Sequence, residues 1–349
     1  MHPRKLQEVR RTQWAACMSQ PVCGDGTVAV TANLRVHVNS LDLSGTGPRT
    51  SGGVGFALAS EHITVVASRA DADHVSGPLG PACAAVLRGL REREPTRFRH
   101  HFRLQTSASA TPHSGLGTTT QVQCAAIEAL LQLECGRAAG FEDLVAAGIG
   151  EMSAIGLRCF LDGGFVVDLG SCAGADVRVR EDPLLRGRAL SPTGRICLPF
   201  PHDWRVLLVQ PVEATSLDGA EEDNFWKSVI PTPRRDAMEA AYWTLLGIIP
   251  AILERDRAAF LGALAGLCSV GAKPAELANQ GPLTLSALDE VRAATGFAGL
   301  SSLGPTVYGF PDPGFSDADL CALQRRHPGH RITLTHVAQR SRSGSLCPG

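Results

Sequence analysis

Hydrophobic and polar positions alternate along several stretches of the chain in the pattern of half-buried strands. Residues 28–38 place valines and a leucine on one parity and Arg35 and His37 on the other, so these two side chains should share a face. Similar runs predict strands at 61–70, 99–108, 165–169, 204–211 and 331–337. Helical spacing predicts helices at 82–94, 122–133, 141–148, 238–255, 256–270 and 285–295. Strands and helices mix without regular β-α-β alternation, which favours an α+β fold.

A glycine and hydroxyl cluster directly precedes the helix at 122–133. Residues 111–121, TPHSGLGTTTQ, carry Gly115 and Gly117 among serine and threonine side chains. Free backbone N–H groups and the helix dipole favour an anion at such a turn, and glycine lets a phosphate approach the backbone. The alternative is a polar N-cap that binds nothing. No Lys follows Gly117 as in a Walker A loop.

Composition and charge narrow the class of protein. The chain has 349 residues and a formal net charge of −1, so no global field attracts nucleic acid or an anionic membrane. The 11 cysteines show no metal-ligand spacing and are expected to be reduced. No apolar run is long enough to span a bilayer, and residues 1–20 lack the apolar core of a signal peptide. We expect a cytoplasmic protein.

Length predicts two domains. We place an N-terminal arm at 1–24, a first domain at 25–195 and a second at 196–340. The boundary follows a loop at 171–195 that is rich in Arg, Pro and Gly. Residues 341–349 are predicted to be a flexible tail.

A second glycine and hydroxyl cluster, GLSSLGPTVYGF at 299–310, precedes the last strand. Together, PHSGLGTTTQ and SSLGPTVYGF resemble the phosphate loop and C-terminal glycine motif of the galactokinase, homoserine kinase, mevalonate kinase and phosphomevalonate kinase superfamily. The resemblance implies a two-domain fold, with a ribosomal protein S5 domain 2-like N-terminal domain and an α/β C-terminal domain. The Asp that serves those kinases as base is replaced here by Gly156, which argues against phosphoryl transfer.

The chain is more similar to a non-kinase branch, the β-ribofuranosylaminobenzene 5′-phosphate synthases of methanopterin biosynthesis. RVHVNSLDL at 35–43, SGGVGFAL at 51–58, GGFVVDLG at 163–170 and PFPHDWRVLLVQP at 199–211 carry the resemblance beside the two glycine motifs. It implies a decarboxylating C-ribosyl transfer from 5-phosphoribosyl 1-diphosphate to an aromatic carboxylic acid. Diphosphate and carbon dioxide are released. It also implies a homodimer.

One motif departs from that branch. Where the family has GRGxRSGIG, this chain has GIGEMSAIG, so Ile149 and Met152 replace two arginines. Arginine grips carboxylates and phosphates, so their loss suggests a changed acceptor. We therefore favour a C-nucleoside synthase of formycin or pyrazofurin type that uses an amino-substituted pyrazole acid. The methanopterin enzyme, an ATP-dependent small-molecule kinase and an inactive regulatory homologue remain as alternatives.

The resemblance assigns roles to individual residues. The phosphates of 5-phosphoribosyl 1-diphosphate are expected at Ser114, Gly115, Gly117, Thr118, Thr119, Thr120, Ser302, Gly304 and Thr306. The acceptor carboxylate is expected at Arg35, His37, Arg49, Met152 and Arg158. Because the donor is strongly anionic, we also predict a requirement for Mg²⁺.

Carboxylates are expected beside the reacting ribose carbon, which gains oxocarbenium character as diphosphate leaves. Asp42 and Asp168 are the candidates for a catalytic role together with His37, and Asp162 and Asp168 for Mg²⁺. The structural alternative is that Asp42 pins a turn and Asp168 only ends a strand.

Overall fold

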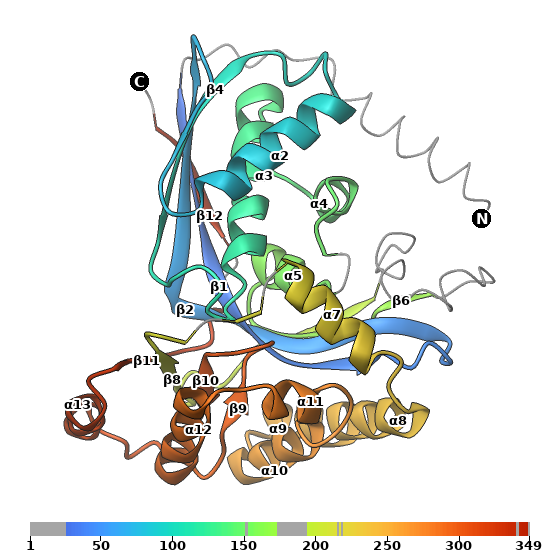
Figure 1. The fold of residues 1–349 in the computed structure, drawn as a ribbon, viewed down its shortest axis with the longest axis vertical. Coiled ribbons are helices and arrows are strands. Elements are labelled where there is room, and N and C mark those ends of the chain that lie inside the picture. The colour runs from blue at the N-terminus through green and yellow to red at the C-terminus, as the bar shows by residue number, and fades with distance from the viewer. Residues whose placement is uncertain are drawn as a thin grey trace.

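The computed structural model describes residues 26–150, 153–172, 194–214, 216–217, 219–339 and 342–347. Two sheets organise these residues (Figure 1). The first has the strand order β12-β1-β2-β4-β3, with β5 and β6 paired to β2 and β7 paired to β5, and the second has the order β11-β8-β10-β9.

The first sheet contains β1 (Thr27–Asp42), β2 (Arg49–Ala70), β3 (His74–Ser76), β4 (His101–Ala108), β5 (Phe165–Asp168), β6 (Ser171–Cys172), β7 (Arg195–Leu198) and β12 (Ser343–Cys347). The second contains β8 (Val206–Pro211), β9 (Gly299–Leu300), β10 (Val307–Gly309) and β11 (His330–Thr335). The helices around the first sheet are α2 (Gly80–Arg93), α3 (Thr118–Cys135), α4 (Phe141–Ala146) and α5 (Ile155–Leu161). The remaining helices are α7 (Gly219–Val229), α8 (Arg234–Tyr242), η2 (Trp243–Ile248), α9 (Ile249–Glu254), α10 (Arg257–Leu267), α11 (Lys273–Ala278), α12 (Pro282–Thr295) and α13 (Asp317–Arg326).

The alternation predicted for β1 is confirmed. Its even-numbered residues from Val28 to Val38 are fully buried, and α3 packs against this face of the sheet (Figure 1). The pairing of β1 with β2 shifts register between Asn33 and Arg35 and again between His37 and Asn39. Such irregularities redirect side chains. Arg35 and His37 thus lie on a short segment of β1 that is set off from the regular strand on both sides.

The helix that follows the first glycine cluster is the central helix of the first sheet. Gly117 precedes α3 in the left-handed conformation, and Gly136 ends it in the same conformation. Most of the α3 side chains are buried. The helix therefore holds the glycine cluster rigidly against the edge of the core.

A shared apolar core joins the two sheets. Phe56 of β2 contacts Phe165 of β5, and it also contacts Tyr308 and Phe310 near the second sheet, with ring centroids about 6 Å apart. These rings are fully buried. The two parts of the molecule are therefore packed against each other through side chains rather than joined only by the chain.

Two predicted boundaries need correction. Strand β7 pairs with β5 in the first sheet, so the first domain extends through Leu198 and the boundary drawn at 195 cuts a strand. Ser343–Cys347, predicted to belong to a flexible tail, forms β12 against β1. The predicted arm at 1–24 and most of the loop at 171–195 lie outside the described residues. Helices α11 and α13 were not predicted, because their apolar spacing is short.

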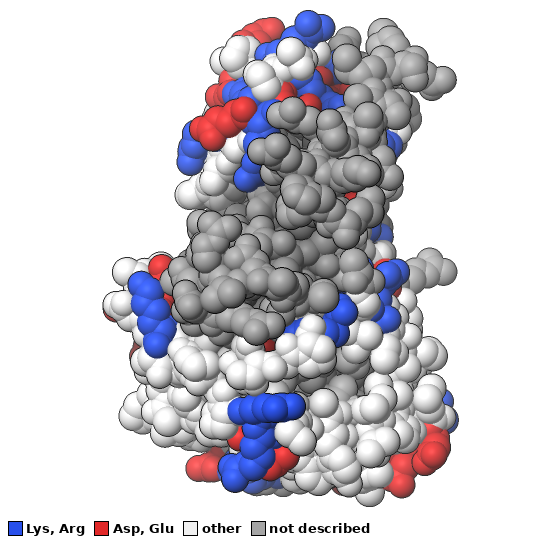
Figure 2. Space-filling model, turned by 90° about the vertical axis from the view of Figure 1, so that its right-hand side faces the viewer, with Lys and Arg blue, Asp and Glu red and all other residues white. Residues whose placement is uncertain are grey.

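The continuous helical segment α8–η2–α9 exposes an apolar face. Met238, Tyr242, Leu245, Leu246 and Leu253 are each more than half exposed. The side of the molecule on which α8 lies is largely uncharged over its lower half (Figure 2). The helical segment Arg234–Glu254 is long and apolar enough to cross a membrane. Core helices of soluble proteins have the same length and composition, so this property alone does not indicate a membrane span.

Candidate active site

The two glycine clusters contact each other directly. The backbone oxygen of Ser114 accepts hydrogen bonds from both the amide and the hydroxyl of Thr306, and the Ser301 hydroxyl donates to the Gly115 oxygen at 2.8 Å. Gly115 has φ 80°, and a Cβ there would lie 2.6 Å from the backbone oxygens of Gly304 and Ser301. Only glycine permits this approach. The loop before α3 and the loop between β9 and β10 thus form one unit.

Arg35 is held by the first of these loops. Its amide donates to the Leu116 oxygen at 3.1 Å, and its Nη1 donates to the Gly115 oxygen at 2.8 Å. Its Nε is buried without a hydrogen-bond partner in the described structure. Burial lowers the pKa of Arg35, while Cys159 and Glu222 partly offset this effect. An arginine keeps its charge at neutral pH, so Arg35 places a cation on the pocket wall.

His37 lies two residues further along β1 and is tied to the second loop. Its amide donates to the Ser301 hydroxyl at 3.2 Å, and its backbone oxygen accepts from the Ser302 amide at 3.0 Å. Both ring nitrogens are buried without partners in the described structure. Burial, then Arg35 and Lys273, holds the pKa of His37 well below its usual value. The neutral ring can donate from one nitrogen and accept at the other.

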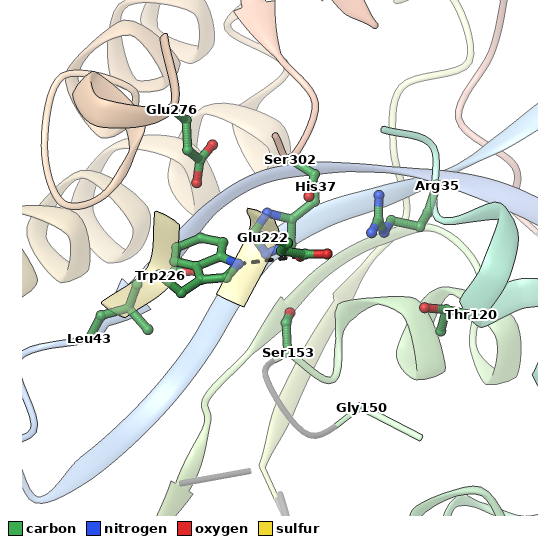
Figure 3. A pocket seen from close by; sticks show the side chains of 11 residues that line it. Arg35, His37, Leu43, Thr120, Gly150, Ser153, Glu222, Trp226, Glu276 and Ser302 are labelled. Carbon is green, nitrogen blue, oxygen red and sulfur yellow. Dashed lines mark hydrogen bonds between the residues drawn. The ribbon is translucent and has the colours of Figure 1, made fainter. Parts of the chain in front are cut away.

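These groups face a pocket between the two parts of the molecule (Figure 3). It has a volume of about 220 Å³. The side chains and backbone that line it belong to Arg35, His37, Ser40, Leu43, Thr120, Gly150, Ser153, Glu222, Trp226, Glu276 and Ser302. In Figure 3, Arg35 and Thr120 lie at one end, Leu43 and Trp226 lie at the other, and His37 and Glu222 lie between them. One end is therefore cationic and polar. The other is bordered by the apolar side chains of Leu43 and Trp226, with the Glu276 carboxylate on the same side.

A buried ion pair supports the second loop. Lys273 and Glu276 are almost completely inaccessible to solvent, and their side chains are paired. The Lys273 ammonium also donates to the backbone oxygens of Leu300 and Ser302. Burial, opposed by the attraction of Lys273, raises the pKa of Glu276. The pair fixes the loop that carries Ser302, and Glu276 reaches the pocket wall.

Two of the predicted phosphate-binding residues, Thr120 and Ser302, line the pocket. Ser114, Gly115, Gly304 and Thr306 lie where the two loops contact each other and are not part of the pocket lining. Thr118 is buried at the start of α3, whereas Thr119 is exposed. A Cβ at Gly117 would lie 2.9 Å from Cζ of Arg35, so this glycine makes room for the guanidinium. The role of these residues in binding phosphate stays a prediction.

Two residues predicted to act on the substrate have structural contacts instead. Asp42 accepts hydrogen bonds from the amide and hydroxyl of Ser44, so it pins the turn after β1. Arg49 donates to the backbone oxygens of Leu169 and Gly170. Neither side chain lines the pocket. Met152 lies outside the described residues.

Arg158, Asp162 and Asp168 lie outside the pocket lining as well. The Arg158 guanidinium stacks 3.8 Å above the ring of Phe141, and Asp162 pairs with Arg195 at 2.7 Å. Asp168 is buried, and burial raises its pKa to about 6 against the attraction of Arg158. Within the described residues, no cluster of three or more His, Cys, Asp or Glu side chains forms. The predicted pair of Asp162 and Asp168 therefore does not make a protein-held Mg²⁺ site by itself.

The position of the kinase base offers no room for a side chain. A Cβ at Gly156 would lie 2.7 Å from the methyl group of Thr120, and the Gly156 oxygen accepts from Gln121 at 2.8 Å. An aspartate there would displace Thr120 from the pocket wall. The absence of this base is thus built into the packing of α5 against α3.

The pocket residues that the sequence did not indicate include Glu222, Trp226 and Glu276, and Lys273, which pairs with Glu276, was not indicated either. The spacing of Glu222 and Trp226 places them on one face of a helix. Nothing in the sequence alone indicates that this face is turned towards Arg35.

The fold is that of the superfamily named above. The homoserine kinase of Cytophaga hutchinsonii matches with a TM-score of 0.62 at 16% identity, over 94% of this chain and 100% of that chain. The phosphomevalonate kinase of Streptococcus pneumoniae matches with a TM-score of 0.58 at 11% identity, over 92% and 100%. Identities this low show the shared fold alone.

The chain belongs to the β-ribofuranosylphenol 5′-phosphate synthase family. It is 30% identical over 291 residues to the protein of that name from Methanothermobacter thermautotrophicus, covering 80% of this chain and 87% of the relative. It is 28% identical over 279 residues to that of Archaeoglobus fulgidus, covering 80% and 86%. No family model matches the chain. The predicted membership of the non-kinase branch is confirmed.

Proposed function

We propose that this protein transfers the phosphoribosyl group of 5-phosphoribosyl 1-diphosphate to the ring carbon of an aromatic carboxylic acid, with loss of carbon dioxide and diphosphate. The relatives are named for a ribofuranosylphenol phosphate product, which supports a hydroxybenzoic acid as acceptor. This reaction corresponds to the methanopterin-type alternative. The pyrazole acceptor of a C-nucleoside synthase has no support from the relatives, and we keep it as one arm of the test.

The observation that carries the proposal is the contact between the two glycine loops around Arg35. It places the Arg35 cation, Thr120 in the first turn of α3 and Ser302 of the second loop on the wall of a pocket that Leu43 and Trp226 border on its other side. Anionic phosphates suit the first end and an aromatic ring suits the second. A volume of about 220 Å³ suits one small ring beside the reacting part of the donor.

The reaction itself requires little from acid–base side chains. The bond between ribose C1 and the diphosphate oxygen breaks, and a bond forms from C1 to the ring carbon that carries the carboxylate. The bond to the carboxylate then breaks, and its electron pair restores aromaticity as carbon dioxide leaves. No proton is removed from the ring carbon. Gly156 in the place of a base is compatible with this chemistry.

We assign Arg35 and the neutral His37 to the acceptor carboxylate. The free Nε–H of Arg35 and a ring N–H of His37 lie side by side on β1 and would hold the carboxylate beside C1. Holding the reactants in this orientation lowers the entropic part of the barrier.

Mg²⁺ is proposed to enter with the diphosphate rather than to reside on the protein. It usually binds through substrate phosphates together with few carboxylates, which fits a site without an acidic cluster among the described residues. When bound, it would neutralise the leaving diphosphate. We further propose a cytoplasmic homodimer that buries the exposed face of α8–η2–α9.

The test is release of diphosphate and carbon dioxide from 5-phosphoribosyl 1-diphosphate and Mg²⁺. The acceptors are 4-hydroxybenzoic, 4-aminobenzoic and aminopyrazole carboxylic acids, each assayed separately. Equal release of both products with a benzoic acid supports the proposal. Release only with the pyrazole acid would establish the C-nucleoside alternative. If no acid gives diphosphate or carbon dioxide but the protein turns over ATP, the kinase alternative would be supported instead.

A further inference from the structure

Two carboxylates line the pocket, and they differ in their partners. Glu276 is buried and paired with the Lys273 ammonium. Glu222 is half-exposed, and the contact that the structure gives it is a 3.3 Å hydrogen bond from the indole N–H of Trp226. Within the described residues Glu222 therefore has no paired ammonium, and the cation that it faces across the pocket is the Arg35 guanidinium.

Glu222 is held at the middle of the pocket. Figure 3 shows its carboxylate between the indole of Trp226 and the guanidinium of Arg35, in front of His37. Trp226 in turn packs with Leu43 and Ile230. The indole thus positions the carboxylate and borders the apolar end of the pocket at the same time.

Stability of the fold does not explain this arrangement. No residue of α7 is buried, so Glu222 satisfies no buried donor of the core. A half-buried carboxylate that accepts one hydrogen bond from an indole on the same helix contributes little to folding, because both groups can bond to water in the unfolded chain. The position of Glu222 across from Arg35 is better explained by a ligand that lies between them.

We infer that Glu222 is a catalytic residue: its carboxylate stabilises the positive charge that develops on ribose C1 as diphosphate departs, and Trp226 positions it. The inference rests on the proposed function. Asp42 and Asp168 were the predicted catalytic carboxylates, and Asp162 was predicted for Mg²⁺, but all three lie outside the pocket lining. Asp42 accepts hydrogen bonds from Ser44 and Asp162 pairs with Arg195, whereas Asp168 is buried away from the pocket. Glu222 forms no covalent bond in this step and exchanges no proton, so the stoichiometry of the reaction is unchanged.

The alternation of charge along the pocket supports the assignment. The phosphates and the carboxylate need the cationic end with Arg35, whereas the cation at C1 needs an anion between that end and the ring. Glu222 lies in that interval. A preorganised carboxylate in a partly dehydrated site acts more strongly than it would in water.

The decisive variant is Glu222→Gln, which keeps shape and removes charge. We expect kcat to fall about 100- to 1,000-fold, the range seen when one preorganised electrostatic group is removed. The KM for donor and acceptor should change less than about threefold, because neither ground state carries the cation. Trp226→Phe should lower kcat by about tenfold or less, since it removes the positioning hydrogen bond and keeps the ring.

Glu221→Gln is the matched control, because Glu221 is an exposed neighbour on the same helix. Its kcat should equal that of the wild type. Far-ultraviolet circular dichroism should be the same for all variants. Thermal unfolding should be unchanged in the Glu221 and Glu222 variants and slightly lower in Trp226→Phe, because the indole packs with Leu43 and Ile230.

Either of two outcomes would overturn the inference: an unchanged kcat in Glu222→Gln, or a loss that is restored by raising Mg²⁺ or acceptor concentration. The latter would make Glu222 a binding group instead. Failure of the proposed function is distinguishable, because then the wild-type protein would release neither diphosphate nor carbon dioxide with any acid.

Discussion

The two ends of the pocket are built in different ways. At the polar end, the two glycine loops exchange backbone and hydroxyl hydrogen bonds, and the buried pair of Lys273 and Glu276 supports them. At the apolar end, α7 lies over the pocket with no buried residue, and Trp226 makes its main apolar contact. The side chains at the polar end also hold the fold together, whereas those of α7 can change with little effect on folding. We therefore expect the donor site to be rigid and acceptor recognition to be adjustable.

Removing the charge that supports the polar end should have the largest effect. Lys273→Met leaves Glu276 buried without its partner, which costs about 3–5 kcal/mol of unfolding free energy. Urea denaturation measures this. The double variant Lys273→Met, Glu276→Leu is the control and should recover most of the loss, because no unpaired charge remains. Equal destabilisation of the single and double variants would show that packing, not charge, supports the loop.

The free energy of unfolding should depend on pH through Asp168, which is buried outside the pocket lining. Its pKa is raised to about 6 in the folded protein, mainly by burial, so the ionised carboxylate disfavours the folded state. The stabilising effect of the protonated form is complete below the unfolded pKa of about 4 and disappears as pH rises through 6. Relative to Asp168→Asn, the wild type should therefore lose about 3 kcal/mol of unfolding free energy between pH 4 and 8. Parallel stability curves for the two proteins would contradict this.

A smaller effect is expected where the two loops touch. In Gly115→Ala, the new methyl group would meet two backbone oxygens, and φ 80° is strained for alanine. We expect a loss of about 1–3 kcal/mol in stability and weaker binding of 5-phosphoribosyl 1-diphosphate in calorimetry. Gly314→Ala is the control, because a Cβ there meets nothing within 4 Å. Unchanged donor affinity in Gly115→Ala would remove this loop from the donor site.

The smallest effect on folding is expected on the exposed face of α8–η2–α9. Leu246→Glu adds a charge to a side chain that is 64% exposed, so the free energy of unfolding should change by less than about 0.5 kcal/mol. If this face forms the proposed homodimer, the variant should be a monomer. Light scattering during size-exclusion chromatography measures the mass. Leu283→Glu on α12 is the comparison and should leave the mass unchanged. A wild-type protein that is already monomeric would reject the interface.

The sequence by itself determined the local structure and the family. The alternation of residues 28–38 predicted β1, and the glycines before an apolar helical run predicted the turn that begins α3. These signals are local, because side-chain periodicity and glycine conformation depend on a few neighbouring residues. The motifs also carried enough identity to place the chain in the non-kinase branch, as the relatives confirm.

Only the tertiary structure decided which charged side chains face the pocket. Arg35 and His37 share the face that the alternation predicted, and the packing of the second loop and α7 over that face forms the pocket, whereas Asp42, a few residues later, accepts hydrogen bonds from Ser44. Glu222 and Glu276 enter the pocket from helices that follow the first glycine loop by more than a hundred residues. Strand β12 pairs with β1 from the opposite end of the chain. Such contacts depend on packing between distant segments. The periodicity within one segment carries no information about that packing.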